Sequence, residues 1–445
     1  MKRLCTMVIG VSLAVAFASA PAGAAPADSI VGLPAWDQAP SAGQGSAAGL
    51  RGVVSFGPSD VWAVGAAGAP QDRTLAEHWN GSSFSVVPSP NRADRANTLE
   101  DVAGVSSNDL WAVGHSDVTN TGAASTLAEH WDGTAWRIVP TPNAAGGSTH
   151  NSLTGVAAVA TDDAWAVGTA STFRPGLLAI TLHWDGSTWT KVRNSCGQGL
   201  SDVVAESSSD VWAVGGDHTC HWNGTTWTPL PAAPDFSGFS VQLQDVAIVS
   251  SNDVWAVGYA LYGCGEGECA TGEIQHWTGG AWEFVTHAVP VLYGVDAVAA
   301  NDVWAVGLGL GPGIEHFDGT DWSQVPSGAR IGELFAVSAS GADDLWGAGD
   351  KGSNTSGALV EQAPSPNSGA VIGRTHVSNA VVSWFGPESG SVTTDPIGGA
   401  YQVGGLTAGT YLFTVSYGGC IPDSKRVTVQ AGTTIAQDFH LNCGG

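Results

Sequence analysis

Hydrophobic and polar positions recur at a fixed spacing along this 445-residue chain. A Leu is followed after ten residues by an Asp, and the Asp opens a short run of Val, Trp and Ala. This motif occurs seven times, at Leu50/Asp60/Trp62, Leu99/Asp109/Trp111, Leu153/Asp163/Trp165, Leu200/Asp210/Trp212, Leu243/Asp253/Trp255, Leu292/Asp302/Trp304 and Leu334/Asp344/Trp346. Because the distance from Leu to Asp never changes, we predict two strands joined by a turn of constant length in every repeat.

A second motif follows the first six of these at a variable distance. It reads His-Trp-x-Gly-x-x-Trp, with Phe317 in place of the first Trp in one copy and Phe84 in place of the last Trp in another. Its histidines are His78, His130, His183, His221, His276 and His316. The Gly supplies the positive φ of a hairpin turn between two apolar runs. Each repeat therefore predicts four antiparallel strands. In the second repeat these are 99–105, 110–114, 126–131 and 136–139.

A four-stranded unit repeated every 42 to 54 residues is typical of a β-propeller, in which each unit forms one blade. The seventh repeat runs only to its third strand, at 359–362. The missing fourth strand has a counterpart at the other end of the chain, because 35–41 is similar to 135–141. We predict an all-β fold, a seven-bladed β-propeller at 25–363 closed by an N-terminal strand that leaves no exposed sheet edge.

The recurring Trp, Val and Ala residues suit the packing of one blade on the next, and 18 of the 19 tryptophans lie in the repeats. We expect the turn Asp and the His of each repeat to form a hydrogen-bond network around an indole. That arrangement resembles the Asp-His-Trp network of WD-repeat propellers. A zinc site is not expected, because one His per blade spreads the imidazoles around a ring, far beyond ligand distances of about 2 Å.

The phrase Trp-Asp-Gly-Thr-x-Trp at 131–136 resembles the Asp-box turn of sialidase-type propellers. The whole array resembles secreted bacterial propeller repeats that are grouped with Kelch and galactose-oxidase propellers, and the resemblance implies the scaffold alone. Sialidase chemistry needs an arginine cluster and a Tyr/Glu pair, whereas only the first predicted innermost strand carries an arginine, Arg51. Galactose-oxidase chemistry needs copper held by tyrosines and histidines near the axis, with a Cys crosslinked to a Tyr, whereas the six cysteines after the signal segment are better used in pairs. We therefore predict no metal and no cofactor.

The segment 370–445 follows a different pattern. Its phrases Tyr-Gln-Val-Gly-Gly-Leu-x-x-Gly-Thr-Tyr at 401–411 and Val-Thr-Val-x-Ala-Gly-Thr at 427–433 resemble the carboxypeptidase-regulatory-like domain. The resemblance implies a small prealbumin-like β-sandwich without catalytic residues. Pro and small polar residues at 364–369 are typical of an extended linker between the two domains.

The first 24 residues have the pattern of a secretory signal peptide, with Lys2 and Arg3, an apolar run at 8–18 and small residues before the cut. We expect a secreted, extracellular protein without membrane insertion, because no apolar run is long enough to span a bilayer. Without this segment the chain has 13 basic and 40 acidic residues, a net charge of −27. Such a surface repels phosphate backbones, so nucleic acid is excluded as a partner. We expect a monomer.

Six cysteines follow the signal segment, and an even number in an exported chain favours disulfides. The simplest connectivity joins sequence neighbours, Cys196 with Cys220, Cys264 with Cys269, and Cys420 with Cys443. The loop of the second pair holds Glu266 and Glu268. Two carboxylates do not fill the six to eight oxygens that Ca²⁺ prefers, so we expect a disulfide-closed loop tip there.

The position after each repeat Leu lies at the loop end of the innermost strand, near the mouth of the central channel. It differs in every blade although its neighbours repeat: Arg51, Glu100, Thr154, Ser201, Gln244, Tyr293 and Phe335. Long, variable loops join the blades on the same face, where binding usually resides on a rigid scaffold. A mixed ring of this kind suits a polar, uncharged ligand such as a glycan. The alternative is that these are half-exposed strand residues without a common role.

The sequence has no Gly-x-Ser-x-Gly, His-Glu-x-x-His or Gly-x-x-x-x-Gly-Lys motif. We therefore predict a non-catalytic binding protein that recognises a polysaccharide or a cell-surface partner through the loop-rich face of the propeller. Propeller active sites are assembled from several blades, so a glycan-active hydrolase, lyase or oxidase at the channel mouth remains an alternative. A protein-interaction scaffold is a second alternative.

Overall fold

The computed structural model describes most of the chain from residue 36 to residue 443. The described ranges are 36–39, 41–42, 48–68, 72–118, 123–144, 150–171, 176–230, 240–264, 267–309, 311–329, 331–342, 344–351, 358–363, 368–387, 389–394, 399–430 and 433–443. Within them every long element is a β-strand and no helix occurs, so the all-β prediction is confirmed for this part of the chain. The predicted signal peptide lies outside the described residues.

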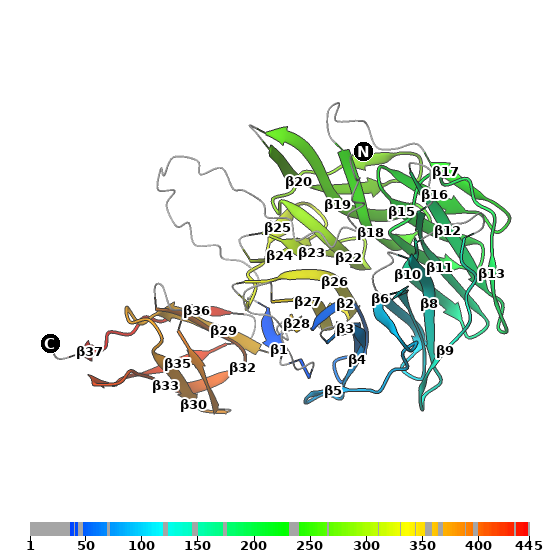
Figure 1. Ribbon diagram of the computed structural model, residues 1–445. Helices are drawn as coiled ribbons and strands as arrows, with labels where there is room; N and C mark the ends of the chain where they lie inside the picture. The colour runs from blue at the N-terminus through cyan, green and yellow to red at the C-terminus, as the bar shows by residue number, and fades with distance from the viewer. Residues whose placement is uncertain are drawn as a thin grey trace, which may run out of the picture.

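Residues 36–363 form seven antiparallel sheets of four strands each, which we number as blades 1 to 7 (Figure 1). Blades 1 to 6 contain β2–β5 (Gly49–Gly57, Asp60–Ala67, Arg73–Trp79, Phe84–Val86), β6–β9 (Arg95–Ser106, Asp109–Val118, Ala123–Trp131, Trp136–Ile138), β10–β13 (His150–Ala160, Asp163–Ser171, Leu177–Trp184, Trp189–Lys191), β14–β17 (Asp202–Ser207, Asp210–Gly215, His218–Trp222, Trp227–Leu230), β18–β21 (Ser240–Ser250, Asp253–Cys264, Gly267–Trp277, Trp282–Phe284) and β22–β25 (Val291–Ala299, Asp302–Leu308, Pro312–Phe317, Trp322–Gln324). Blade 7 contains β26 (Glu333–Gly341), β27 (Asp344–Asp350), β28 (Ala358–Gln362) and β1 (Asp37–Ala39). The predicted repeat of four-stranded blades is confirmed.

The two ends of the repeat region meet in blade 7. Strand β1 pairs antiparallel with β28, with Asp37 opposite Gln362, and Figure 1 shows β1, in blue, beside β28. Trp36, just before β1, is fully buried and packs on Trp304 of blade 6. The innermost strands contact one another in cyclic order, and β26 of blade 7 contacts β2 of blade 1. The N-terminal segment therefore supplies the aromatic residue and the fourth strand that blade 7 lacks.

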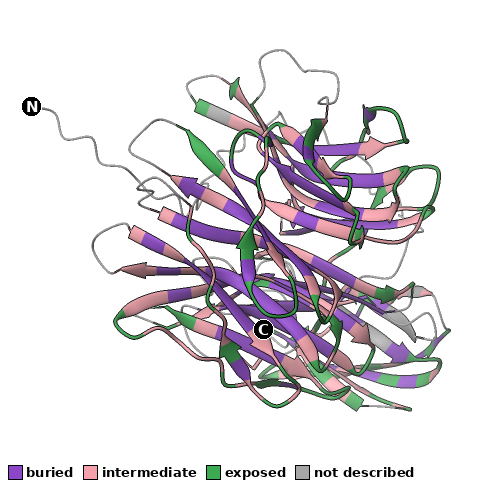
Figure 2. Ribbon diagram, turned by 90° about the vertical axis from the view of Figure 1, so that its right-hand side faces the viewer, coloured by how far each residue is buried: buried purple, intermediate pink, exposed green. Residues whose placement is uncertain are grey.

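The predicted Asp-His-Trp network is present in blades 1 to 6. In each, the turn Asp lies 2.7 to 2.8 Å from the His Nε2. The Trp ring packs on that imidazole with centroids 3.8 to 4.5 Å apart. The same Trp reaches the next blade, as Trp111 does on Trp184 and Trp189. Figure 2 shows the resulting buried stripe along the middle of the blade strands. The invariant turn thus serves the packing between blades.

Strand β6 begins at Arg95, four residues before Leu99, and is longer than the predicted strand 99–105. Arg51 is therefore not the only arginine of an innermost strand, and that part of the sequence analysis was wrong. The guanidinium of Arg95 donates to the backbone oxygen of Ser116 at 3.3 Å, so it serves the packing of blade 2.

In four blades a buried carboxylate holds the blade to the chain segment that arrives from the blade before it. The residue before the His position of the third strand faces the core, and in four blades it is a fully buried Glu: Glu77, Glu129, Glu315 and Glu361. Glu315 accepts hydrogen bonds from the backbone N–H of Ala288 and Val289 at 2.7 and 2.9 Å. In blade 4 the same position is Cys220, whose disulfide to Cys196 joins the arriving segment covalently. A disulfide thus takes the place of a buried carboxylate.

All three disulfides of the structure join sequence neighbours, Cys196 with Cys220, Cys264 with Cys269, and Cys420 with Cys443. The predicted connectivity is the one observed.

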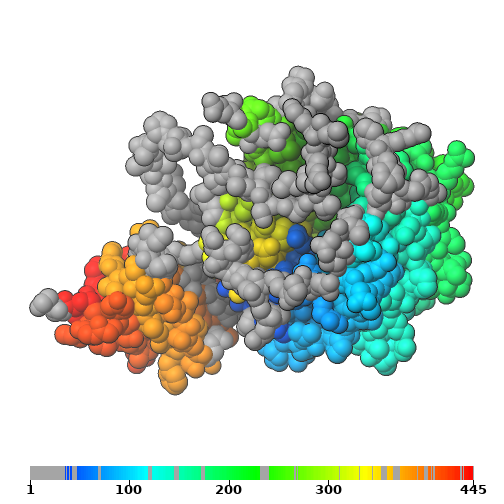
Figure 3. Space-filling view, in the orientation of Figure 1, coloured from blue at the N-terminus to red at the C-terminus, as the bar shows by residue number. Residues whose placement is uncertain are grey.

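Residues 368–443 form a second lobe, orange to red in Figure 3. Its strands are β29 (Ser368–Arg374), β30 (Val381–Phe385), β31 (Ser389–Thr393), β32 (Ala400–Thr407), β33 (Gly409–Ser416), β34 (Cys420–Ile421), β35 (Asp423–Val429), β36 (Thr434–Ala436) and β37 (Asn442–Cys443). One sheet has the order β32-β29-β36 and another β31-β30-β33-β35. Both contribute to one core, with Val371 and Tyr401 from the first sheet and Val382 and Phe413 from the second.

Candidate functional site

Six of the seven predicted channel-mouth residues lie at β-bulges of the innermost strands. The pairing with the second strand skips Arg51, Glu100, Thr154, Gln244, Tyr293 and Phe335 and resumes at the following residue. Ser201, the seventh, directly precedes β14, and its backbone N–H donates to the oxygen of Val214 at 2.7 Å. A bulge takes one residue out of the regular alternation of a strand and can re-aim its side chain. The position that varies between repeats is therefore the one released from the regular blade pattern.

The bulge also explains the Gly that ends the Trp-Ala-Val-Gly run of the second strand. A Cβ on Gly114 would lie 2.0 Å from the backbone oxygen of Thr98, and a Cβ on Gly168 would lie 2.0 Å from that of Ser152. No side chain fits at such a distance. This Gly is a sequence signal of the bulge that the spacing between repeats does not reveal.

Three aromatic residues and Arg51 form a continuous set across blades 5, 6, 7 and 1, which we call the aromatic arc. Tyr259 packs edge-on against Tyr293 with ring centroids 6.3 Å apart, and Tyr293 packs on Phe335 at 5.4 Å. The guanidinium carbon of Arg51 lies 4.2 Å from the Phe335 centroid, a cation–π contact. Burial, with the charge of Glu333, raises the pKa of the Tyr293 phenol. The arc therefore presents neutral hydroxyl groups and one exposed cation.

A charged cluster in blade 2 surrounds His115. The imidazole Nδ1 lies 3.3 Å from Glu100 Oε1, and Nε2 lies 3.3 Å from Asp117 Oδ2. Burial opposes a positive charge here, but the hydrogen bond to Asp117 and the charge of Glu100 outweigh it and raise the pKa of His115. His150 lies 3.8 Å from the other oxygen of Asp117, and burial followed by the nearby His115 lowers its pKa. The cluster favours one imidazolium between two carboxylates.

Ser152 gives this cluster the composition of a Ser-His-Asp triad, with Ser152 Oγ 3.2 Å from His115 Nδ1. Two observations oppose nucleophilic catalysis. The imidazolium that the carboxylates favour has no lone pair with which to accept the Ser proton. The Ser152 residue is also only 6% exposed, and its hydroxyl donates to the oxygen of Leu153 at 3.3 Å.

Two other predicted residues satisfy backbone groups. Thr154 Oγ1 donates to the oxygen of Leu200 in the next blade at 2.9 Å. The Gln244 amide donates to the oxygens of Gln242 and Leu243 at 3.4 and 3.3 Å. Of the seven predicted residues, Arg51, Tyr293, Phe335 and Glu100 thus contact other aromatic or charged side chains. Thr154, Ser201 and Gln244 hydrogen-bond to the backbone of the blades.

Four half-buried aspartates next to the bulges link neighbouring innermost strands, and the sequence analysis did not single them out. They are Asp101, Asp202, Asp245 and Asp296, and each accepts a hydrogen bond from a backbone N–H of the next blade at 2.7 to 3.3 Å. Burial raises the pKa of Asp101 to about 7 and that of Asp296 to about 6. Burial, followed by the charge of Asp245, also raises the pKa of Asp202, and burial raises the pKa of Asp245. Their sequence signal is an Asp that follows the variable position in repeats 2, 4 and 5.

Among the described residues, no group of three or more His, Cys, Asp or Glu side chains is arranged to hold a metal ion. The tip of the Cys264–Cys269 loop, at 265–266, lies outside these residues, so the expectation of an ion-free loop stays a prediction. No helix in the described ranges has the length and apolar character needed to cross a membrane.

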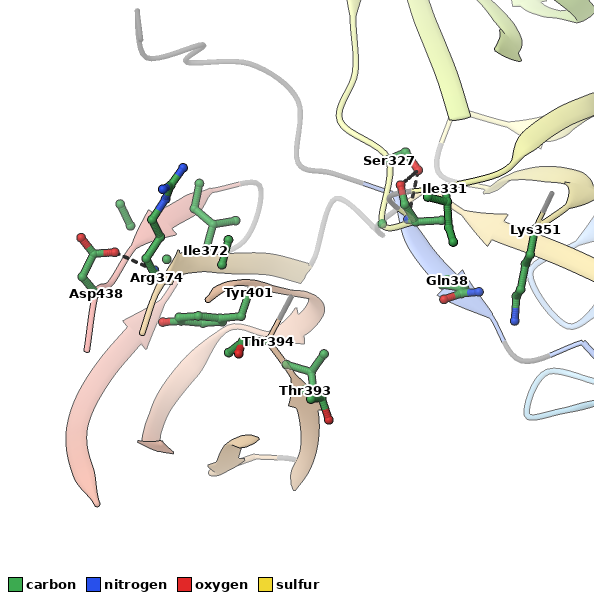
Figure 4. A pocket seen from close by; sticks show the side chains of 16 residues that line it. Gln38, Ser327, Ile331, Lys351, Ile372, Arg374, Thr393, Thr394, Tyr401 and Asp438 are labelled. Atoms are coloured by element: carbon green, nitrogen blue, oxygen red, sulfur yellow. Dashed lines mark hydrogen bonds between the residues drawn. The ribbon is translucent and has the colours of Figure 1, made fainter. Parts of the chain in front are cut away.

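A groove of about 780 Å³ lies between blade 7 and the second lobe (Figure 4). Ile331 and Lys351 line its propeller wall, and Ile372 and Arg374 line the opposite wall. The groove lining mixes apolar, hydroxyl and charged side chains, and Asp438 lies beside Arg374 on the wall of the second lobe. The channel mouth has the denser set of mutually contacting aromatic and charged side chains, and we take the mouth as the candidate site.

Known proteins resemble this chain in fold and hardly in sequence. No family model matches it, and a search of curated proteins found no match. Among solved structures, U3-55K is 10% identical with a TM-score of 0.50 over 75% of this chain and 100% of that chain. The WD40 repeats of RRP9 are 10% identical with a TM-score of 0.50 over 75% and 99% of the two chains. The WD40 β-propeller domain of Doa1 is 12% identical with a TM-score of 0.47 over 74% and 96%. At 10% identity, the likeness to U3-55K and RRP9 shows the β-propeller fold alone.

Proposed function

We propose that the protein is an exported, non-catalytic binding protein, a closed seven-bladed β-propeller with a C-terminal β-sandwich, whose channel mouth recognises a polypeptide segment of a cell-surface partner. The aromatic arc carries this proposal. It gathers Tyr259, Tyr293, Phe335 and Arg51 from four blades at one place. Tyr and Arg are the residue types that, with Trp, dominate the binding energy of protein interfaces.

The charge around the arc favours a partner with cationic side chains. Glu100 and Asp117 lie in the adjoining cluster, and Glu333 shares a hydrogen bond with Tyr293. The mature chain carries a net charge of −27. Such a field speeds the association of a cationic partner and weakens with salt. The uncharged glycan expected from the sequence suits this charged mouth less well, and it is the alternative outcome of the test.

The test selects peptides from a random display library on the full-length protein and counter-selects them on a Tyr293→Ala/Arg51→Ala variant. We expect Lys- or Arg-containing peptides whose affinity falls roughly 30-fold in that variant, the loss typical of a hot-spot residue. Val86→Ala, at a side chain 51% exposed on the outer strand of blade 1, is the matched control and should bind normally. Glycan-array binding that depends on the same two residues would assign a carbohydrate instead. If neither library yields a ligand that depends on them while the circular dichroism is unchanged, the proposal fails.

One observation keeps an enzyme as the second candidate, namely the contact of Ser152 and Asp117 with His115. A hydrolase would turn over ester or glycoside substrates in a panel, and Ser152→Ala would abolish the turnover. Turnover that survives this substitution would have to come from other groups at the mouth.

A further inference from the structure

The outer face of the tail sheet β31-β30-β33-β35 has an unusual composition. Its strands alternate, with Val382, Tyr411 and Phe413 directed into the core and their neighbours directed to solvent. By the strand register, the outward residues are Val381, Ser383 and Phe385 on β30, Ser389, Ser391 and Thr393 on β31, Thr410, Leu412, Thr414 and Ser416 on β33, and Ser424, Arg426 and Thr428 on β35. All of them are exposed or half-buried. We call this set the hydroxyl face, because most of its members are Ser or Thr.

The hydroxyl face carries no carboxylate, although the chain has 40 acidic residues. Arg426 is its one charged residue. Two pairs of hydroxyls lie within hydrogen-bond distance across the strands, Thr410 with Thr428 at 3.0 Å and Thr414 with Ser424 at 2.9 Å. The face of this acidic protein therefore carries a single positive charge and no negative one, and the strand pairing fixes its hydroxyls in rows.

An exposed aromatic ring lies within these rows. Phe385 is 73% exposed, the highest value among the large hydrophobic residues of the described chain. It is opposite Ser389 on one neighbouring strand and opposite Leu412 on the other, and Leu412 is opposite Arg426. Leu412 is 38% exposed, so an apolar strip formed by Phe385 and Leu412 crosses the middle of the face. Such a strip surrounded by polar groups is typical of a binding surface.

We propose that the hydroxyl face binds a chain of neutral polysaccharide. A sugar ring has an apolar C–H face that can cover Phe385 and Leu412, and hydroxyl groups at its rim that both donate and accept. The Ser and Thr hydroxyls of the face also donate and accept, so they can exchange water for sugar without leaving a buried polar group unpaired. No carboxylate has to lose its hydration, which would oppose binding. This site lies on the second lobe and is independent of the channel mouth.

The experiment measures depletion of the full-length protein from solution by four insoluble or gel-forming neutral polymers, cellulose, chitin, xylan and starch. We expect binding to at least one of them that persists at high salt, because neutral ligands are not held by charge. Phe385→Ala should weaken it about tenfold, as expected for an apolar side chain that is covered on binding. Thr414→Glu should weaken it as well, because it places a carboxylate in the middle of the face.

Matched controls separate this site from the channel mouth and from a general loss of fold. Ile421→Ala removes another exposed side chain of the same lobe, 67% exposed and outside the face, and should bind as the wild type does. Tyr293→Ala should also retain polymer binding, so failure of the mouth proposal leaves this result unaffected. No retention on any of the four polymers, retention equal in Phe385→Ala, or retention lost at high salt would each overturn the proposal. Concentration-dependent dimers that Phe385→Ala abolishes would assign the face to a second copy of the chain and would overturn it too.

Discussion

Asp296 should make the stability of the ring depend on pH in a direction opposite to that of an ordinary surface carboxylate. Its Oδ1 accepts the backbone N–H of Ala297, and its Oδ2 accepts that of Ala339 in blade 7, both at 2.8 Å. Burial raises its pKa from 3.8 to about 6 in the folded protein, against the effect of these hydrogen bonds. The folded state therefore holds a proton that the unfolded state has released between these pH values.

The sign and the size follow from this difference. The stability that Asp296 contributes is complete below about pH 4 and is lost as the pH rises through about 6. A shift of about two pKa units corresponds to a loss of about 3 kcal/mol in the free energy of unfolding. Asp296→Asn removes the titration but places an amide NH₂ against one of the two N–H donors, which costs about 1 kcal/mol. The variant should be the less stable protein at about pH 4.5 and the more stable one, by about 2 kcal/mol, at about pH 8.

Urea unfolding followed by tryptophan fluorescence at both pH values measures this crossing. Asp132→Asn is the matched control, because hydrogen bonds from Thr134, Ala135 and Arg137 lower the pKa of Asp132. Its contribution is present at neutral pH and is lost as the pH falls, so this variant should differ from the wild type mainly near neutrality. A stability difference between wild type and Asp296→Asn that is the same at both pH values would refute the reasoning.

Three further substitutions test the junctions between blades. Glu315→Ala leaves the buried N–H of Val289 and the N–H of Ala288 without their acceptor, and it should lower the free energy of unfolding by about 2 to 3 kcal/mol in urea titrations, whereas Glu283→Ala on an exposed position should change it little. Replacing Cys196 and Cys220 together by Ser removes a link across 24 residues and should cost about 3 kcal/mol. The variant should have a lower Tm than the wild type, and a reductant should lower its Tm by less than it lowers that of the wild type. Trp36→Ala empties a fully buried site against Trp304 and should cost about 3 to 5 kcal/mol, and an unchanged Tm would show that the N-terminal strand does not hold blade 7.

The blades could be predicted from the sequence because each repeat makes the same contacts within and between blades with the same residue types. Asp109 holds the turn and the imidazole of His130, which supports the indole of Trp111, and Trp111 in turn packs on the next blade. Inserting or deleting one residue in the turn would break all three contacts, so the spacing between Leu and Asp is constant and can be recognised in the sequence. The disulfides were predictable for a related reason, since each joins segments that are neighbours in the sequence.

The site was harder to predict because its geometry depends on contacts between repeats. The sequence shows that position 51 and its counterparts vary, but it does not show that six of them are bulges, since a bulge is defined by what the partner strand skips. The predicted ring closure makes blade 7 the neighbour of blade 1, but the sequence does not show that the Arg51 guanidinium lies over the Phe335 ring. The contact of Thr154 with the backbone oxygen of Leu200 was equally invisible, because it depends on the path of the chain in the next blade.

The residue before the His position of the third strand differs in chemistry from blade to blade. It is Glu in four blades, Cys220 in blade 4, Leu182 in blade 3 and Gln275 in blade 5. In the four Glu blades and in blade 4 this position holds the chain segment that arrives from the preceding blade, but the chemistry differs. Burial raises the pKa of the Glu129 carboxyl to about 7, so the stability that this junction contributes is lost as the pH rises through about 7, whereas the Cys196–Cys220 junction responds to reductant. Since a closed ring opens only when one junction yields, a rise in pH and a reductant should select different first openings in the same molecule.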